Sequence, residues 1–223
     1  MSEELEVLKL LSQHLRTAGI PFMVTGSMAL NYYTVPRMTC DIDLVVELRE
    51  ADVERLVAAL GPDWHADREE ILDAVRRPGM FNVIHYPTGV KVDMVVRKNE
   101  PYREAEFARR RPVQVAGIEV MMVAPEDLLP SNPRGVEVSR DTSQAMDRRY
   151  REMLLARSGE ERFLMGCSMY ATARQLVEAG LRGLDPTVTE SDLRVGVFRR
   201  FYGRDLSAEK MDRVIRGMLR AEP

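Results

Sequence analysis

The chain has 223 residues, of which 45% are hydrophobic and 30% are charged, and its net charge is −3 at pH 7. This length and composition are typical of one or two ordinary globular domains. No run of about 18 uncharged apolar residues occurs, which excludes a transmembrane helix, and the acidic start lacks the basic region of a secretory signal. The two cysteines, Cys40 and Cys167, form no disulfide framework, so we expect a cytoplasmic protein with no membrane partner.

The first half of the chain alternates helical and strand patterns. Leucines at positions 5, 8, 11 and 15 recur at helical spacing, and Gly19 ends that run. In chain order, the elements expected after this first helix are a buried strand over 21–25, a small helix over 28–33, a strand over 41–48, a helix over 51–60, hairpin strands over 80–86 and 90–96, a helix over 103–110, and a second hairpin around Gly117. This pattern predicts a mixed β-sheet with flanking helices.

The second half has a different pattern. Prolines and a glycine between Leu129 and Gly135 cannot continue a helix, and no strand pattern follows them. We expect four helices here. The first covers 142–156, the second begins at the capping box of Ser158 and Glu161, the third runs from Thr189 to Gly203, and the fourth lies around 211–219. The sequence therefore predicts an α+β domain over residues 1–130, a linker over 131–138, and an all-α domain over 139–223.

The most informative pattern is Gly26-Ser27, followed after a gap of 13 residues by Asp41-Ile42-Asp43. Alternate side chains of a strand share one face, so Asp41 and Asp43 should project together while Ile42 faces the core. Two carboxylates on one face repel each other unless a cation lies between them. Mg²⁺ or Mn²⁺ takes oxygen ligands and suits such a pair.

A third carboxylate, Asp93, lies on a later strand of valines and shares a face with Lys91. If strand 90–96 lies beside strand 41–48, Asp93 completes a triad with Asp41 and Asp43. Such a triad can hold two metal ions about 3.5–4 Å apart for in-line phosphoryl or nucleotidyl transfer. One metal would lower the pKa of an acceptor hydroxyl, Asp93 could take its proton, and the other metal would hold a triphosphate.

Phosphate-binding groups accompany these carboxylates. Gly26 lets the backbone approach a ligand closely, and the Ser27 hydroxyl and nearby helix N–H groups can bind phosphate oxygens. Lys91 or Arg37 could neutralise charge on a leaving pyrophosphate.

These residues resemble the nucleotidyltransferase superfamily of DNA polymerase beta, whose pattern is Gly-Ser, then Asp-x-Asp, then a third acidic residue on a later strand. The run from Gly26 to Leu44, together with Lys91-Val92-Asp93 and the Pro125-Glu126-Asp127-Leu128 segment, looks most like the AbiEii-type and minimal nucleotidyltransferases of bacterial toxin–antitoxin and phage-defence systems. The resemblance covers about residues 5–130. It implies a metal-dependent transfer of a nucleoside monophosphate from a nucleoside triphosphate to RNA, a protein or a small molecule. It also implies that the chain forms a homo-oligomer or binds a toxin–antitoxin partner.

Other interpretations remain open. In AbiEii-type proteins a long helix with further site residues follows the Pro-Glu-Asp-Leu segment, whereas Pro130 and Pro133 interrupt this chain. The alternative function is therefore a catalytically inactive binding or regulatory module of a toxin–antitoxin pair, and a metal-dependent phosphohydrolase is a third. Individually, Lys91 could simply balance the charge of Asp93, and Arg37 could be a loop charge. Phe201 and Tyr202 are interpreted as core residues rather than ligand-stacking ones.

Overall fold

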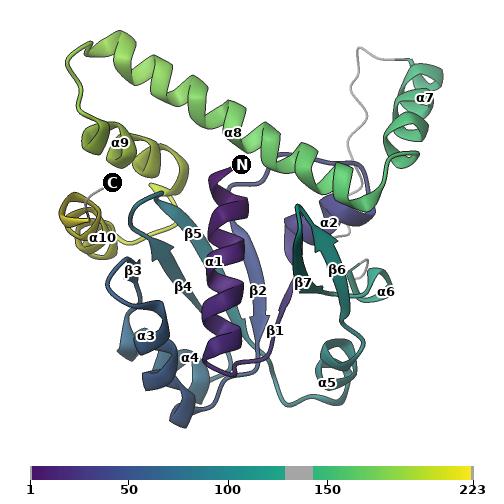
Figure 1. Cartoon of the computed structure of the whole chain (residues 1–223), viewed down its shortest axis with the longest axis horizontal. Helices are drawn as coiled ribbons and strands as arrows, with labels where there is room; N and C mark the ends of the chain where they lie inside the picture. Colours follow the sequence, from purple (N-terminus) through teal and green to yellow (C-terminus); the bar gives the residue numbers. More distant parts are fainter. Residues whose placement is uncertain (1, 129–142, 222–223) are drawn as a thin grey trace.

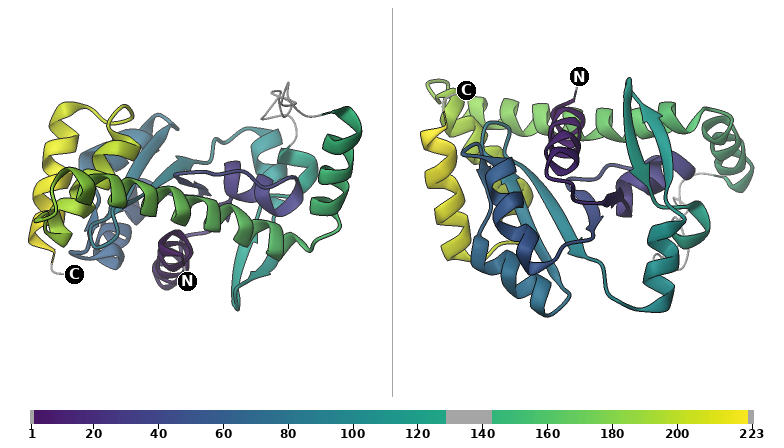
Figure 2. Two further views of the ribbon diagram at one scale, coloured as in Figure 1. Left: turned by 90° about the horizontal axis from the view of Figure 1, so that it is seen from above. Right: turned by 60° about the horizontal axis from the view of Figure 1, so that its bottom comes forward.

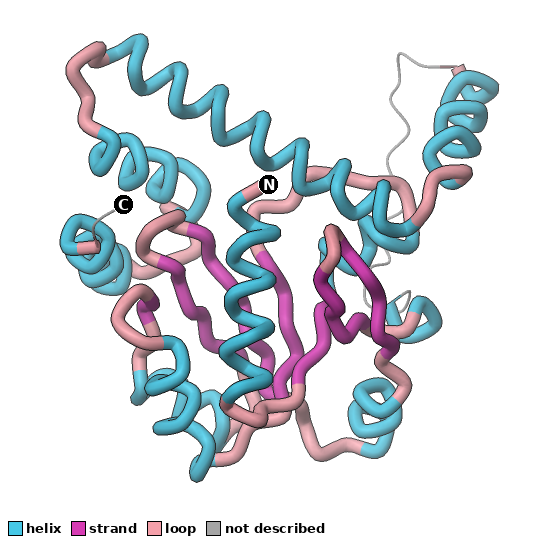
Figure 3. The backbone as a smooth tube through the Cα atoms, in the orientation of Figure 1, coloured by secondary structure: helices cyan, strands magenta, loops and turns pink. Residues whose placement is uncertain are grey.

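The structure is a computed structural model that describes residues 2–128 and 143–221. A seven-stranded sheet forms its centre, and helices surround the sheet (Figures 1 and 3). The strands are β1 (Phe22–Val24), β2 (Ile42–Val46), β3 (Trp64–His65), β4 (Met80–His85), β5 (Val90–Val96), β6 (Arg111–Val115) and β7 (Ile118–Met122). Their order across the sheet is β3-β4-β5-β2-β1-β7-β6.

The sheet combines parallel and antiparallel pairs, as expected. The hairpins β4–β5 and β6–β7 are antiparallel and so is the pair β1–β2, whereas β2–β5 and β1–β7 are parallel. The expectation of a mixed sheet with two hairpins is therefore confirmed. The parallel pairing of β2 with β5 matters most for the predicted site, because it places two strands with acidic residues side by side.

The helices follow the sequence pattern with two additions. They are α1 (Glu3–Thr17), α2 (Gly26–Tyr33), α3 (Val53–Leu60), α4 (Arg68–Arg76), α5 (Pro101–Ala108), α6 (Pro125–Leu128), α7 (Gln144–Leu155), α8 (Gly159–Leu184), α9 (Glu190–Tyr202) and α10 (Ala208–Arg220). The two additions are helices α4 and α6, and the sequence analysis also missed the two-residue strand β3. Asp67 begins α4 by accepting bonds from the backbone N–H groups of Glu69 and Glu70.

One face of the sheet carries the main core. Four leucines of α1 are buried, at positions 5, 8, 11 and 15, and alternating residues of β2 and β5 are fully buried with them: Ile42, Leu44, Val92 and Met94. Helix α1 runs along the front of the sheet in Figure 1. Because these apolar residues alternate with Asp43 and Asp93, the acidic side chains are directed to the opposite face.

The C-terminal helices pack on the first half of the chain. Helix α8 crosses one end of the sheet, with α1 and α2 on its two sides (Figure 2, left). Helices α9 and α10 build a second apolar cluster on Ile84 of β4, using Phe198, Tyr202, Val214 and Met218. Residues 143–221 contain no strand, as expected. The expected linker over 131–138 lies outside the described residues, and the division into two domains stays a prediction.

Candidate functional site

The turn between β1 and α2 is built around Gly26. Its φ angle is +60°, and a methyl group added to Gly26 would overlap the carboxylate of Asp43. The backbone N–H of Ser27 points to Asp43 Oδ2 at 3.4 Å. Glycine is therefore required here both by the backbone conformation and by the close approach of an acidic side chain.

The three expected carboxylates converge on one face of neighbouring strands. Asp43 and Asp93 are direct partners in the parallel register of β2 and β5. Asp41 precedes β2 by one residue, and its Oδ2 lies 3.1 Å from Lys91 Nζ, while Asp93 Oδ2 lies 2.7 Å from the same nitrogen. The structure thus brings together Gly26, Ser27 and all three acidic residues.

Lys91 is the cation of this group. Its side chain is 5% exposed, and its ammonium bridges Asp41 and Asp93. Burial by itself lowers the pKa of Lys91, but the hydrogen bond to Asp93 and the charge of Asp41 outweigh burial, so the pKa lies above its ordinary value. Lys91 is therefore held in its charged form between the carboxylates.

One ammonium does not neutralise three carboxylates. Burial, followed by the charge of Asp41, raises the pKa of Asp43 to about 6, and the backbone N–H of Ser27 and the charge of Lys91 offset this only in part. When all four groups are ionised, Asp41, Asp43, Asp93 and Lys91 carry a formal charge of −2. The site therefore has an excess of negative charge that a divalent cation would satisfy.

The donor chemistry fits Mg²⁺ or Mn²⁺, because these ions take carboxylate oxygens. Within residues 2–128 and 143–221, however, no group of three or more His, Cys, Asp and Glu side chains is arranged to hold a metal ion as it stands. The ammonium of Lys91 lies between two of the expected ligands instead. Metal binding would require Lys91 to move away from Asp41 or Asp93.

Arg37 is exposed and contacts the turn at Ser27. Its guanidinium donates to Ser27 Oγ at 2.8 Å. The side chain of Asn31 fixes the backbone of Arg37 by two hydrogen bonds of 2.9 Å, one to the carbonyl and one from the N–H. Gly166 of α8 packs so closely on Asn31 that a larger residue would overlap it. The C-terminal half therefore supports the position of a predicted phosphate-binding residue.

Two residues that the sequence analysis did not assign to the site contact it, and a third holds one of them in place. Tyr202 of α9 is fully buried, as expected for a core residue, but its hydroxyl donates to the carbonyl of Cys40, next to Asp41. Its ring lies 5.6 Å from Lys91 Nζ, within cation–π range. Asn82 of β4 donates to Asp93 at 3.0 Å, and Lys210 of α10 contacts Asn82 at 2.5 Å.

These contacts cannot be predicted from any short sequence motif. Tyr202 and Lys210 come from helices more than 100 residues along the chain from their partners Lys91 and Asn82. Asn82 could have been found only through the register of β4 with β5, where it is the partner of Asp93. The missing information is thus the tertiary packing of α9 and α10.

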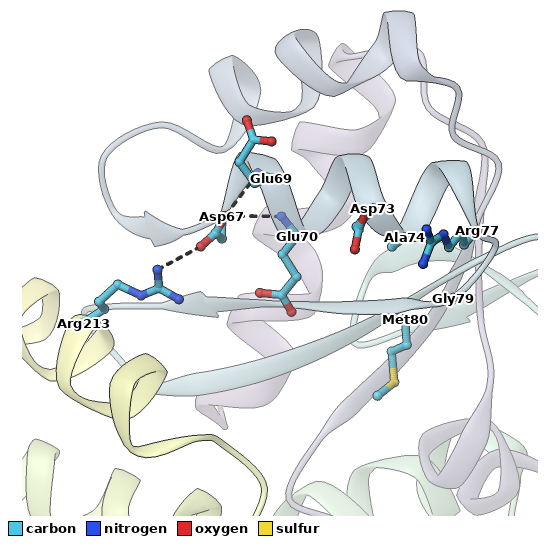
Figure 4. A pocket seen from close by; sticks show the side chains of 9 residues that line it. All are labelled: Asp67, Glu69, Glu70, Asp73, Ala74, Arg77, Gly79, Met80 and Arg213. Atoms are coloured by element: carbon cyan, nitrogen blue, oxygen red, sulfur yellow. Dashed lines mark hydrogen bonds and ion pairs between the residues drawn. The ribbon is translucent and has the colours of Figure 1, made fainter.

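An open pocket of about 650 Å³ lies beside this network, between α4, the start of β4 and α10 (Figure 4). It contains none of the three site carboxylates. In Figure 4 the side chain of Glu70 extends from α4 toward the strands, and Arg213 of α10 pairs with Asp67. The pocket therefore marks the contact between α4 and α10.

Comparison with known proteins adds no relative, since no family model and no curated protein sequence matches the chain. The resemblance to nucleotidyltransferases stays a prediction that depends on the motif residues. No helix within the described parts of the chain is long and apolar enough to cross a membrane.

Proposed function

We propose that this protein is a metal-dependent nucleotidyltransferase that moves a nucleoside monophosphate from a nucleoside triphosphate to a hydroxyl acceptor. The observation that carries the proposal is the convergence of Asp41, Asp43 and Asp93 beside the Gly26–Ser27 turn. Acidic residues are rarely buried beside one another without a function, because their mutual repulsion and desolvation are costly. A phosphate-binding turn next to a cation site is the arrangement that triphosphate chemistry needs.

The reaction forms one bond and breaks one bond. The acceptor oxygen attacks the α-phosphorus, the bond between the α-phosphorus and the bridging oxygen to the β-phosphate breaks, and pyrophosphate leaves with that oxygen. Asp93, the most buried of the three carboxylates, would take the proton of the hydroxyl. A divalent cation held by Asp41, Asp43 and Asp93 would supply charge stabilisation and activate the acceptor hydroxyl.

The remaining site residues would bind the phosphates. Ser27 and Arg37 lie on the half-exposed side of the turn, where a triphosphate can enter, and their side chains are already joined by a hydrogen bond. Lys91, once released from Asp41 or Asp93, would be placed to neutralise charge on the leaving pyrophosphate. These assignments account for each conspicuous polar residue of the turn and the two strands.

A second function, a nucleotidyltransferase-like binding module without catalysis, is favoured by one observation. The ammonium of Lys91 bridges Asp41 and Asp93 at 3.1 and 2.7 Å and is stacked against Tyr202. If Lys91 is a permanent counter-ion, no divalent cation can enter. The two functions therefore differ in whether a divalent cation can replace the Lys91 ammonium between the carboxylates.

The test is label transfer from each of four α-³²P-labelled nucleoside triphosphates with Mg²⁺, using cell RNA, protein and small hydroxyl compounds as acceptors. We expect transfer with one of them, loss of transfer in Asp41→Asn, and unchanged transfer in the matched control Asp63→Asn, whose exposed carboxylate lies outside the site. Pyrophosphate must appear in equal amount. Release of inorganic phosphate without transfer would indicate a phosphohydrolase, and no reaction with no nucleotide-dependent stabilisation would favour the binding module.

A further inference from the structure

The buried lysine of α10 reaches toward the site. Lys210 is 8% exposed, and its Nζ lies 2.7 and 2.6 Å from the two carboxylate oxygens of Glu70 and 2.5 Å from Oδ1 of Asn82. A lysine ammonium has three donors and no acceptor. All three donors of Lys210 are thus used, two on α4 and one on β4.

This contact fixes the orientation of the Asn82 amide. Because an ammonium can only donate, the carbonyl oxygen of Asn82 must face Lys210, and the NH₂ group of Asn82 must face the other way. That NH₂ group donates to Asp93 Oδ1 at 3.0 Å. The second oxygen, Oδ2, remains for Lys91 at 2.7 Å.

We propose that Lys210 and Asn82 are positioning residues that hold the Asp93 carboxylate in one orientation, with one oxygen fixed and the other directed into the site. The inference rests on the proposed function, since it gives Asp93 a role as a metal ligand and base. Without Lys210, the carbonyl end of the Asn82 side chain loses its anchor, so Asn82 can change rotamer and its bond to Asp93 Oδ1 is no longer held in place. The Asp93 carboxylate would then be free to turn away from its position.

A neighbouring ion pair provides the matched control. One turn after Lys210 on α10, Arg213 pairs with Asp67 at 3.3 Å (Figure 4). Both pairs join α10 to α4, but only Lys210 contacts Asn82. If Lys210 only anchors α10, neither Lys210→Met nor Arg213→Met should change Mn²⁺ affinity, although Lys210→Met should cost more stability because the Lys210 side chain is 10% exposed against 43% for Arg213. If Lys210 positions Asp93, only Lys210→Met should weaken Mn²⁺ binding.

The experiment measures Mn²⁺ binding to the full-length protein by electron paramagnetic resonance, with no nucleotide present, and nucleotide transfer in parallel. Loss of an outer-shell partner typically weakens metal binding about 10–100-fold, so we expect Lys210→Met and Asn82→Leu each to weaken Mn²⁺ binding by about tenfold. We expect kcat to fall by at least about tenfold with a KM for the triphosphate within about twofold of wild type. Arg213→Met should stay within about twofold in all three quantities.

The double variant Lys210→Met/Asn82→Leu separates a chain of contacts from two independent effects. If Lys210 acts through Asn82, the double variant should be no worse than Asn82→Leu alone. Asn82→Leu keeps the pair of Lys210 with Glu70, so it tests the proposal even if Lys210→Met does not fold. Equal Mn²⁺ affinities in Lys210→Met, Asn82→Leu and Arg213→Met would overturn the inference while leaving the proposed function intact. A wild-type protein that neither binds Mn²⁺ nor transfers nucleotide would overturn both.

Discussion

The two sides of the candidate site differ in how they are held. On the turn side, Ser27 is half-buried, Arg37 is exposed, and one hydrogen bond of 2.8 Å joins their side chains. The strand side, with Lys91 and Asp93, is buried and is covered by helices from the far end of the chain. Under the proposed function, the strand side would set the geometry and the turn side would receive the triphosphate. Substitutions should therefore affect stability on one side and binding on the other.

The largest effect on stability is expected at Lys91. Lys91→Met leaves Asp41 and Asp93 close together without their counter-ion, and removal of one partner of a buried ion pair costs about 3–5 kcal/mol. We expect this loss in urea unfolding without metal and a partial recovery with Mn²⁺, because the site would then accept the divalent ion. A loss that Mn²⁺ leaves unchanged would favour Lys91 as a permanent counter-ion.

Gly26 should come next, although it lies on the turn side. In Gly26→Ala the added methyl group meets the Asp43 carboxylate at a positive φ angle, so we expect a loss of at least about 2–3 kcal/mol, together with loss of transfer. Gly19→Ala is the matched control, since Gly19 has a φ angle of +62° and open space around its Cβ position. That variant should cost only about 1 kcal/mol. Equal losses would mean that backbone conformation alone requires Gly26.

Asp43 gives a pH-dependent prediction of intermediate size. Its pKa is about 6 in the folded protein against 3.8 ordinarily, so the folded state holds its proton more tightly than the unfolded state. The resulting stability is fully present below about pH 4 and is lost as the pH rises through about 6. Asp43→Asn should therefore be more stable than wild type by roughly 1–2 kcal/mol at pH 8 without metal.

The advantage of Asp43→Asn should shrink toward zero at pH 4, as measured by urea unfolding at both pH values. Mg²⁺ should stabilise the wild type at pH 8 and stabilise Asp43→Asn much less. An advantage that is the same at pH 4 and pH 8 would show that Asp43 titrates normally in the folded protein.

The smallest effects on stability are expected at Ser27 and Arg37. Ser27 is half-buried and Arg37 is exposed, so Ser27→Ala and Arg37→Ala should change the free energy of unfolding by no more than about 0.5 kcal/mol. Their effect should appear instead in the KM for the triphosphate, which we expect to rise by roughly tenfold from loss of phosphate contacts. An unchanged KM in both variants would place the phosphates elsewhere.

The sequence contained enough local information to predict half of this site. Alternation along β2 and β5 directed Asp43 and Asp93 to one face because Ile42 and Val92 need burial, and Gly26-Ser27 marked the turn. A single strand pattern cannot specify which strand is its neighbour, so the neighbouring position of strands 41–48 and 90–96 had to be assumed. That position is confirmed by the parallel pairing of β2 and β5, whose register also places Asp43 opposite Asp93.

The other half of the site depends on contacts between distant segments. Lys210 reads locally as one of many surface charges on an amphipathic helix, and Tyr202 reads as a core residue. Their contacts with Asn82 and Cys40 follow from the way α9 and α10 pack on β4, which no periodicity in the sequence encodes. The strand β3 was missed because two residues carry no recognisable pattern.

The shared apolar cluster on β4 has a consequence for handling the protein in pieces. Ile84 is fully buried, and apolar side chains of α9 and α10 cover it. A fragment ending at residue 130 would present Ile84 and the neighbouring Tyr86 to water on a strand face, a surface that favours self-association. Expressed alone, such a fragment should have low solubility, and supplying residues 139–223 as a separate polypeptide should restore it.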